Sequence, residues 1–460
     1  MPPESPALNR RFFIKTAGLG LAALAATDFS SPAKAAARGT SRHFFDVKKV
    51  KRTAVRVPFR EVPKRAMDRE LPHWRFFEIF EVTLGSGQTG IGETLLYYTW
   101  GRTNDTAVRR AIGKNALDLI WDDSLGAGLQ ISLFDAVART AGVPVHRLLG
   151  RQVNQTTPLS WWNIDTSAAD MATECQLAHE TGYLSYKTKG RPWFDIYEQL
   201  EQSAAVVPPE FKIDMDFNAT LLTAEKGMKI IKDLEKYPQV DIYETPIPQA
   251  DIAGNRKLCD ATHVNIALHY GTPKPHEVVE HKCGDGFVVG GGASKTTTAG
   301  RFSEEAGLPF WLQLVGSGIT AAYSLHFGGV LQNATWPAVN CHQLYTHNLL
   351  TKPITVTQGH AHVPDTPGLG YELDRDTINR FKIDPTKKRP EPERLLETVF
   401  ADGSRMYVAN DGGVNFMLRP AMAGNMPFYK KGADTKLLPD DGSPRWRRLY
   451  EAARKGPIYR

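Results

Sequence analysis

The chain has 460 residues, 42% of them hydrophobic, so it can bury a large core, either as two or three domains or as one α/β barrel with appendages. Its net charge of +6 at pH 7 is small, and no lysine- or arginine-rich block tracks a phosphate backbone, which argues against nucleic acid as a partner. The four cysteines are too few and too scattered for a disulfide framework or a zinc knuckle. We expect the four cysteines to be buried as small hydrophobic side chains. In an oxidising compartment, one or two disulfides are the alternative.

Residues 1–37 resemble a twin-arginine (Tat) signal peptide. Arg10 and Arg11 precede a weakly hydrophobic run, residues 16–26, that is too short to span a bilayer, and Ala-x-Ala cleavage sites follow. The pattern predicts an exported, periplasmic protein with no membrane association after cleavage, because no other stretch is long and apolar enough to span one. The alternative is an ordinary basic tail.

Three strand patterns come next, followed by two helical stretches. Apolar and polar side chains alternate at 47–59 and 74–84, with a polar loop between them, and a third strand follows a glycine turn at 89–93. Helical spacing covers 105–122 and 124–141. These elements predict an α+β domain.

After Gly150 short apolar strands alternate with helical segments, at roughly 25 to 30 residues per unit, as in parallel βα units. We expect strands to end near Trp161, Lys189, Asp216, Glu244, His269, Val289, Leu312 and Val339. Eight such units make a (β/α) barrel, whose active site lies at the C-terminal ends of the strands.

Two lysines end the second of these strands. Lys187 and Lys189 are two residues apart, so their side chains share one face of the strand. If that face is the barrel interior, both ammonium groups are removed from water together. This favours the neutral form of at least one lysine, and a neutral lysine can act as a general base. The alternative is that both lie on a solvated loop.

Carboxylates end the next two strands. Asp216, with Asn218 beside it, ends one strand, and Glu244 ends the other. Two like charges at neighbouring strand ends need a cation between them, and hard oxygen ligands favour Mg²⁺ or Mn²⁺. The alternative is that Asp216 caps the following helix and Glu244 pairs with an arginine.

A KxK strand followed by DxN and then ExP is similar to the mandelate racemase and muconate-lactonising branch of the enolase superfamily. The resemblance extends to a GxGE-like segment at 90–93, a segment at 133–150 similar to ALWD…GxPVxxLLG, and a PGLG segment at 367–370. It covers residues 44–375, and the order and spacing of the motifs make it specific.

The resemblance implies an α/β fold, a (β/α)-barrel (modified TIM barrel) at 151–375 with an N-terminal α+β capping domain at 44–150 that closes over the barrel mouth and helps to choose the substrate. Residues 376–460 extend beyond the family's usual end. Within them, 395–416 alternates like a hairpin. We expect the protein to form a homo-oligomer. The extension could pack on the cap or contribute contacts within that oligomer.

The resemblance also implies roles for the residues at the strand ends. Asp216 and Glu244 would hold the metal, with Asn218 nearby. Lys189 would remove the proton α to a substrate carboxylate, and Lys187 would neutralise that carboxylate. The metal would stabilise the resulting enediolate.

The sequence departs from the family at several strand ends. His269 stands where an acidic third ligand is expected and could replace it, which would favour Mn²⁺, Fe²⁺ or Zn²⁺ over Mg²⁺, or it could hydrogen-bond within the barrel. Gln313 stands where racemase-like members have a histidine, so a two-base racemase is not expected. Lys295 and Trp161 are further candidates for the substrate pocket. However, a lysine at the start of a helix is more often solvated, and a tryptophan at a strand end more often fills the space between barrel and cap.

These features predict a metal-dependent enzyme, a dehydratase (lyase) or isomerase that works through an enediolate on a small hydroxy acid or sugar acid. The alternative is a catalytically degenerate periplasmic binding protein of the same fold. The complete KxK, DxN, ExP set favours the enzyme, because a binding protein has no need of a desolvated lysine pair beside a metal. A nucleotide enzyme is disfavoured, since the glycines at 290–292 lack GxGxxG spacing.

Overall fold

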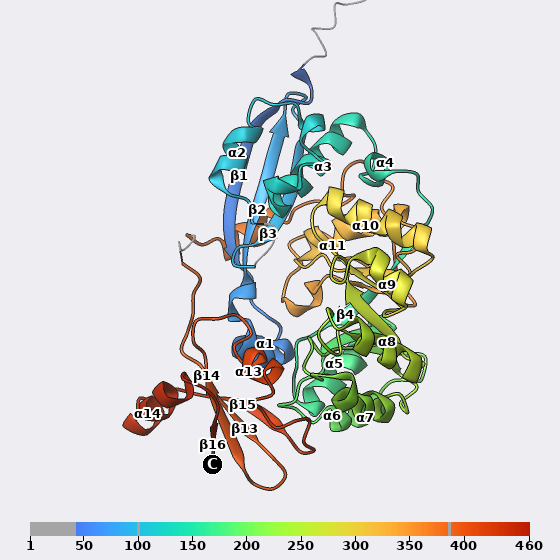
Figure 1. The fold of residues 1–460 in the computed structure, drawn as a ribbon. Helices are drawn as coiled ribbons and strands as arrows, with labels where there is room; N and C mark the ends of the chain where they lie inside the picture. Colours follow the sequence, from blue (N-terminus) through green and yellow to red (C-terminus); the bar gives the residue numbers. More distant parts are fainter. Residues whose placement is uncertain (1–42, 99–101, 385–387) are drawn as a thin grey trace, which may run out of the picture. The chain divides into compact units, whose positions relative to one another are not determined.

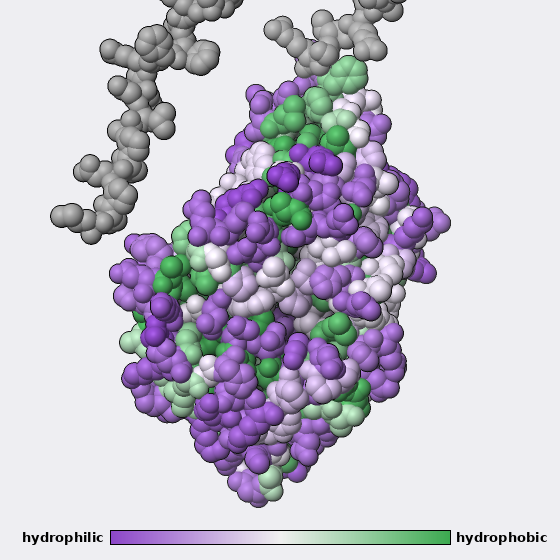
Figure 2. All heavy atoms as spheres, turned by 90° about the vertical axis from the view of Figure 1, so that its right-hand side faces the viewer, coloured by the Kyte–Doolittle hydropathy of each residue, from purple (hydrophilic) through white to green (hydrophobic). Residues whose placement is uncertain are grey.

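The computed structural model describes residues 43–98, 102–384 and 388–460. The predicted signal peptide lies outside these residues. Within them, no helix has both the length and the apolar character needed to cross a membrane. The face of the molecule in Figure 2 carries mostly hydrophilic side chains with small, separate hydrophobic patches, as is usual for a chain that buries most of its large apolar residues.

The capping domain is a three-stranded antiparallel sheet with a helix packed on it (Figure 1). Its strands are β1 (Val47–Arg56), β2 (Phe76–Leu84) and β3 (Thr89–Leu95), and its helices are α1 (Glu61–Glu70), α2 (Asp105–Ala111), α3 (Ala127–Ala141) and α4 (His146–Leu149). The three predicted strands are confirmed. The prediction of a polar loop between β1 and β2 is wrong, because α1 forms there. Its buried positions include Pro63, Ala66 and Met67, a narrow apolar face that the surrounding charges hide in the sequence.

Two glycines of the GxGE segment let β3 lie directly against α3. A Cβ atom at Gly90 would come 2.2 Å from the carbonyl oxygen of Ser132, and one at Gly92 would come 2.2 Å from that of Gly128. No side chain fits in that space, so glycine is required for the close approach of the two backbones.

The glutamate of the same segment joins the cap to the barrel. Glu93 is fully buried and accepts hydrogen bonds from the backbone N–H groups of Ser317 (2.7 Å) and Thr320 (2.8 Å), at the start of α11 (Gly318–Val330). A carboxylate there satisfies N–H groups that have no partner within the helix and complements the helix dipole. Burial raises the pKa of Glu93, although these hydrogen bonds oppose the shift.

We expect Glu93→Ala to lower the free energy of unfolding by about 1–3 kcal/mol, because buried N–H groups lose their acceptor. Denaturant titration of the purified protein measures this. Glu61→Ala is the matched control, since the Glu61 side chain is 93% exposed and its loss should change stability by less than about 0.5 kcal/mol. Equal stability of the two variants would show that the carboxylate does not join cap and barrel.

Eight parallel strands form a nearly closed barrel in the order β10-β9-β8-β7-β6-β5-β4-β11. They are β4 (Thr156–Trp162), β5 (Ser185–Lys189), β6 (Lys212–Asp216), β7 (Val240–Glu244), β8 (Asn265–His269), β9 (Gly286–Val289), β10 (Phe310–Leu312) and β11 (Ala338–Val339). Seven of the eight predicted strand ends are confirmed. The eighth, that of β4, lies one residue later than predicted, at Trp162.

Seven helices connect these strands: α5 (Ala168–Glu180), α6 (Ile196–Ala204), α7 (Ala224–Leu234), α8 (Ile252–Ala261), α9 (Pro275–His281), α10 (Ala293–Ala306) and α11. The expectation of eight complete units is wrong at the last one. A short 3-10 helix follows β11, and the chain then returns as β12 (His360–His362), antiparallel to β4.

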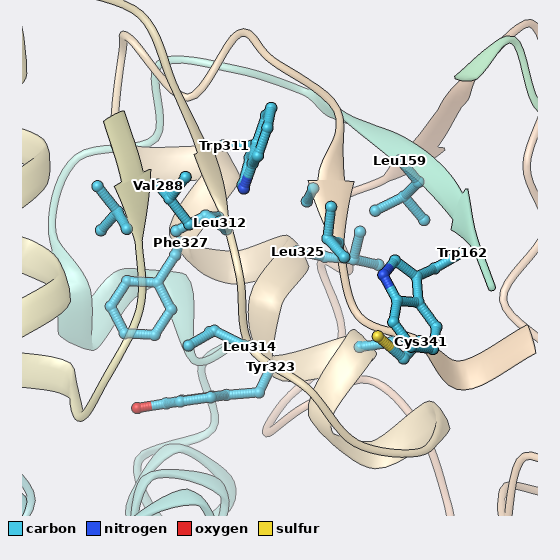
Figure 3. Packing of buried hydrophobic residues seen from close by; sticks show 14 of the residues in the cluster. Leu159, Trp162, Val288, Trp311, Leu312, Leu314, Tyr323, Leu325, Phe327 and Cys341 are labelled. Carbon is cyan, nitrogen blue, oxygen red and sulfur yellow. The ribbon is translucent and has the colours of Figure 1, made fainter. Parts of the chain in front are cut away.

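Every residue of α11 is buried, which is typical of a helix enclosed on all sides. Figure 3 shows part of this core, in which Leu325 and Phe327 of α11 lie near Leu312 of β10. Barrel and cap share one hydrophobic core. All four cysteines are free, and three of them are buried.

The C-terminal extension folds as a second antiparallel sheet in the order β15-β13-β14-β16. After α12 (Arg375–Phe381) come β13 (Leu395–Val399), β14 (Arg405–Ala409), α13 (Leu418–Met422), β15 (Asp434–Leu438), α14 (Pro444–Ala453) and β16 (Ile458–Tyr459). The hairpin predicted in 395–416 is confirmed. Part of the extension packs on Trp193 and Phe194, in the loop after β5.

Candidate active site

A cavity of about 330 Å³ lies at the C-terminal ends of the barrel strands. The barrel contributes the lysines and carboxylates at the ends of β5, β6 and β7. The cap contributes Leu71, His73, Trp74, Tyr97 and Tyr98, and the extension contributes Val414, Asn415 and Leu418. Its size is that of a small-molecule site. Three parts of the chain therefore enclose one pocket.

Lys187 is held rigidly on the cavity floor. Its side chain is 1% exposed, contacts the Glu244 carboxylate, donates to Gln313 Oε1 at 2.8 Å and lies 4.8 Å from the Trp311 ring centre. Burial alone would lower the pKa of Lys187, but the carboxylates of Glu244 and Asp216 outweigh it and raise the pKa above its usual value. Lys187 is therefore a fixed positive charge, not the neutral lysine considered from the sequence.

Lys189 lies on the same side of the barrel and is less constrained. Its ammonium contacts Asp216, and its side chain is 16% exposed against 1% for Lys187. Asp216 Oδ1 also accepts a hydrogen bond from the backbone N–H of Asn218 at 2.8 Å. Because Lys189 pairs in register with Asp216, and Asp216 with Glu244, the three side chains stand at one level of the barrel.

Glu244 is buried as deeply as Asp216. Its side chain is 1% exposed, and His269 Nε2 lies 2.9 Å from its Oε1 atom. Burial alone would raise the pKa of Glu244, but the Lys187 ammonium and His269 hold the pKa well below its usual range. Neither carboxylate oxygen accepts a well-directed hydrogen bond from the described residues, so both have lone pairs free for another ligand.

The described residues contain no cluster of three or more His, Cys, Asp or Glu side chains arranged to hold a metal ion. Asp216 and Glu244 each face a lysine, and His269 contacts only the second of them. The donor chemistry nevertheless fits a hard cation, because Mg²⁺ is usually held by one or two carboxylates with the remaining positions taken by water or substrate.

The remaining predicted pocket residues divide into two groups. Gln313 and Asn218 line the cavity, Gln313 as the acceptor for Lys187. Trp161 does not line it, which corrects the prediction. Its indole donates to Glu174 of α5 at 2.9 Å on the outer face of the barrel, and Trp162 points inward instead, because neighbouring strand residues face opposite ways.

Lys295, the other predicted pocket residue, lies beside this cavity and does not line it. Lys295 lines an adjoining cavity of about 220 Å³ together with Tyr98, His269 and Gln313, which border both spaces. Its backbone N–H is bound by Asp123 of the cap, which fixes the start of α10 there.

Several lining residues were missed from the sequence. Arg191 could have been found by extending the two-residue spacing of Lys187 and Lys189 by one step. Cys341 also lines the cavity, and Figure 3 shows its side chain next to that of Trp162. The extension's Asn415 follows no motif, so only the fold could bring it to the barrel mouth.

Known proteins of similar sequence or structure support the fold described above. Residues 170–377 match the family described as Enolase C-terminal domain-like. The arabinonate dehydratase of Saccharolobus solfataricus is 23% identical, over 63% of this chain and 79% of that protein. The L-Ala-D/L-Glu epimerase of Bacillus subtilis is 24% identical, over 54% and 70%. The structure of muconate cycloisomerase from Pseudomonas fluorescens superimposes with a TM-score of 0.60 at 20% identity, covering 74% of this chain and all of that one.

Proposed function

We propose that this chain, an enzyme of the enolase superfamily, removes the proton α to a carboxylate and completes an elimination or isomerisation through an enediolate. The observation that carries the proposal is the pairing of Lys187 with Glu244 and of Lys189 with Asp216 in one cavity. Two buried carboxylates beside two lysines supply both a cation site and a base.

The different surroundings of the two lysines support different roles. Lys187 is locked by Glu244, Gln313 and Trp311, so it would bind and neutralise the substrate carboxylate. Lys189 is more exposed, so it is free to reach the α-proton and take it. Asp216 and Glu244, with His269, would hold a divalent cation, which when bound would stabilise negative charge on the carboxylate oxygens.

Where β10 and β11 end at the cavity, the described residues supply no second base. Gln313, Val315, Val339 and Cys341 line that part of the cavity. An amide does not take up a proton, and burial raises the pKa of the Cys341 thiol to about 12, so it stays protonated. Proton exchange should therefore occur from one face of the substrate, as in a dehydration or a one-base isomerisation.

A hydroxy acid or sugar acid is the substrate class we propose. Support comes from the distant similarity to an arabinonate dehydratase. The muconate lactonizing enzyme complexed with muconolactone, which has a similar fold, supports a small carboxylate in general. Metal analysis of the purified protein, followed by a screen of sugar acids and uronates for α-proton exchange in D₂O, tests the proposal. A protein that carries no divalent metal and exchanges no acid would contradict it.

We also propose export through the Tat pathway, on the basis of Arg10, Arg11 and the apolar run after them. Changing both arginines to lysine should leave the precursor in the cytoplasm, because the Tat receptor reads the arginine pair. Cell fractionation with an antibody against the mature protein measures this. Export of the double-lysine variant at the wild-type level would contradict the assignment.

A further inference from the structure

Arg191 is a buried cation that forms no ion pair with the described residues. Its side chain lines the cavity, and the residue is 3% exposed. Nη1 donates to the carbonyl oxygen of Phe217 at 3.0 Å and Nη2 donates to Asn218 Oδ1 at 2.6 Å, while Nε is buried without any hydrogen bond. Among the described residues no carboxylate reaches ion-pair distance of this guanidinium. The Trp193 ring is a further contact, with its centre 5.6 Å from the guanidinium carbon. A buried charge balanced only by neutral groups is costly unless a ligand completes it.

Two acidic side chains that border Arg191 already pair with other groups. Asp165 and Glu70 share a small neighbouring cavity with Arg191. Asp165 accepts from Arg69 at 3.0 Å and from the Trp193 indole at 2.7 Å, and Glu70 accepts from Arg69 at 3.0 Å. The protein therefore pairs a different arginine with these carboxylates.

Arg191 continues the line of cations formed by Lys187 and Lys189. The pairing of β5 with β6 runs one residue past the strand, since the N–H of Gly190 donates to the Asp216 carbonyl oxygen at 3.0 Å. Each two-residue step along an extended chain adds roughly 7 Å. Arg191 thus lies beyond Lys189 toward the barrel mouth, at the end of the cavity away from Lys187.

The charges of the cavity favour a dianion. When Lys189 acts as the base its amine is neutral, so two cations (Lys187 and Arg191) stand against two carboxylates (Asp216 and Glu244), which leaves a formal charge of 0 with His269 neutral. A divalent cation would raise it to +2. A ligand with two carboxylates would bring the charge closer to neutral than a ligand with one.

The C-terminal extension holds the segment that carries Arg191. The buried Tyr429 hydroxyl donates to the Gly190 carbonyl oxygen at 3.0 Å and lies 2.6 Å from Thr220 Oγ1. Thr435 Oγ1 donates to the Trp193 carbonyl oxygen at 2.7 Å. These bonds fix the loop after β5.

We infer that Arg191 binds a second carboxylate of the substrate, so that the substrate is a hydroxy or sugar dicarboxylic acid, and that the extension positions Arg191 for this contact. The inference rests on the proposed function, which places the first carboxylate at Lys187. Asn415 and Leu418 of the extension close the same end of the cavity.

The test compares matched acids that differ only in the distal group: galactarate with galactonate, and malate with 2-hydroxybutyrate. Titration calorimetry of the mature protein with saturating Mn²⁺ should show the diacid of at least one pair binding roughly 10- to 100-fold more tightly than the monoacid, the range for a hydrogen bond to a charged group. Arg191→Gln should remove that preference and leave monoacid affinity unchanged. Arg191→Lys, which keeps the charge but not the planar fork, should retain part of it.

Two further variants test whether the extension acts by positioning Arg191 or through its own positive charge. Tyr429→Phe removes only the hydroxyl that anchors Gly190, so it should weaken diacid binding and spare the monoacid. Lys430→Gln removes a positive charge from the same extension at an exposed side chain paired with Asp402, and should change neither affinity. Circular dichroism and denaturant titration confirm that each variant is folded.

Equal affinity of both members of each pair, including no binding of any of the four acids, would overturn the inference. Tighter, Arg191-dependent binding of 6-phosphogluconate than of galactarate would also overturn it, by assigning the subsite to a phosphate. Lys189-dependent α-proton exchange of the monoacids, measured in parallel, tests the proposed function separately, because that reaction needs only the first carboxylate.

Discussion

Replacing Lys189 by methionine should slow exchange of the substrate α-proton with solvent deuterium by about 10²–10⁴-fold, the usual contribution of a general base. Methionine keeps most of the side-chain volume and removes the amine, so the barrel should fold normally. NMR in D₂O with an acid found in the screen measures the exchange. The configuration at the α-carbon should be retained, since the described residues that line the cavity where β10 and β11 end include no second base.

The control for this experiment is metal binding. Lys189 contacts Asp216 but does not contribute an oxygen ligand, so Lys189→Met should keep its divalent cation while losing exchange. Lys187→Met should instead weaken substrate binding, because it removes the charge that meets the carboxylate. Equal exchange rates in wild type and Lys189→Met, or racemised product from wild type, would move the role of base to another group.

Removing either carboxylate of the proposed cation site should abolish metal binding. Asp216→Ala and Glu244→Ala each leave one carboxylate and at most one imidazole, which hold a hard cation poorly. Metal content after dialysis and titration with Mn²⁺ measures the loss. Glu225→Ala, an exposed acid outside the cavity, should bind as wild type does. Wild-type metal content in the Asp216, Glu244 double variant would refute the assignment of the site.

His269 provides a finer test of the same site. Its Nε2 atom lies 2.9 Å from the Glu244 carboxylate, close enough to share a cation with it. If it is the third ligand, His269→Ala should weaken Mn²⁺ or Zn²⁺ far more than Mg²⁺, since imidazole contributes little to Mg²⁺ binding. Unchanged affinity for all three ions would assign the third position to water or substrate.

The sequence by itself determined the barrel and the floor of its site. Strand ends could be located because apolar runs and the polar residues after them are local patterns, and parallel strands bring their C-terminal ends to one edge. That is why Lys187, Lys189, Asp216 and Glu244 could be expected in one place before any coordinates, and why Gln313 could be expected beside them.

Only the tertiary structure decided the features that depend on contacts between distant segments. The inward residue of β4 is Trp162 and not Trp161, since facing depends on how the strand is turned in the barrel. Lys187 keeps its charge because Glu244, from another strand, compensates its burial. The part of the extension that reaches the cavity carries no motif. That Arg191 forms no ion pair with any described carboxylate is likewise visible only in the folded chain. Such properties belong to pairs of residues far apart in the chain, and periodicity along one segment does not encode them.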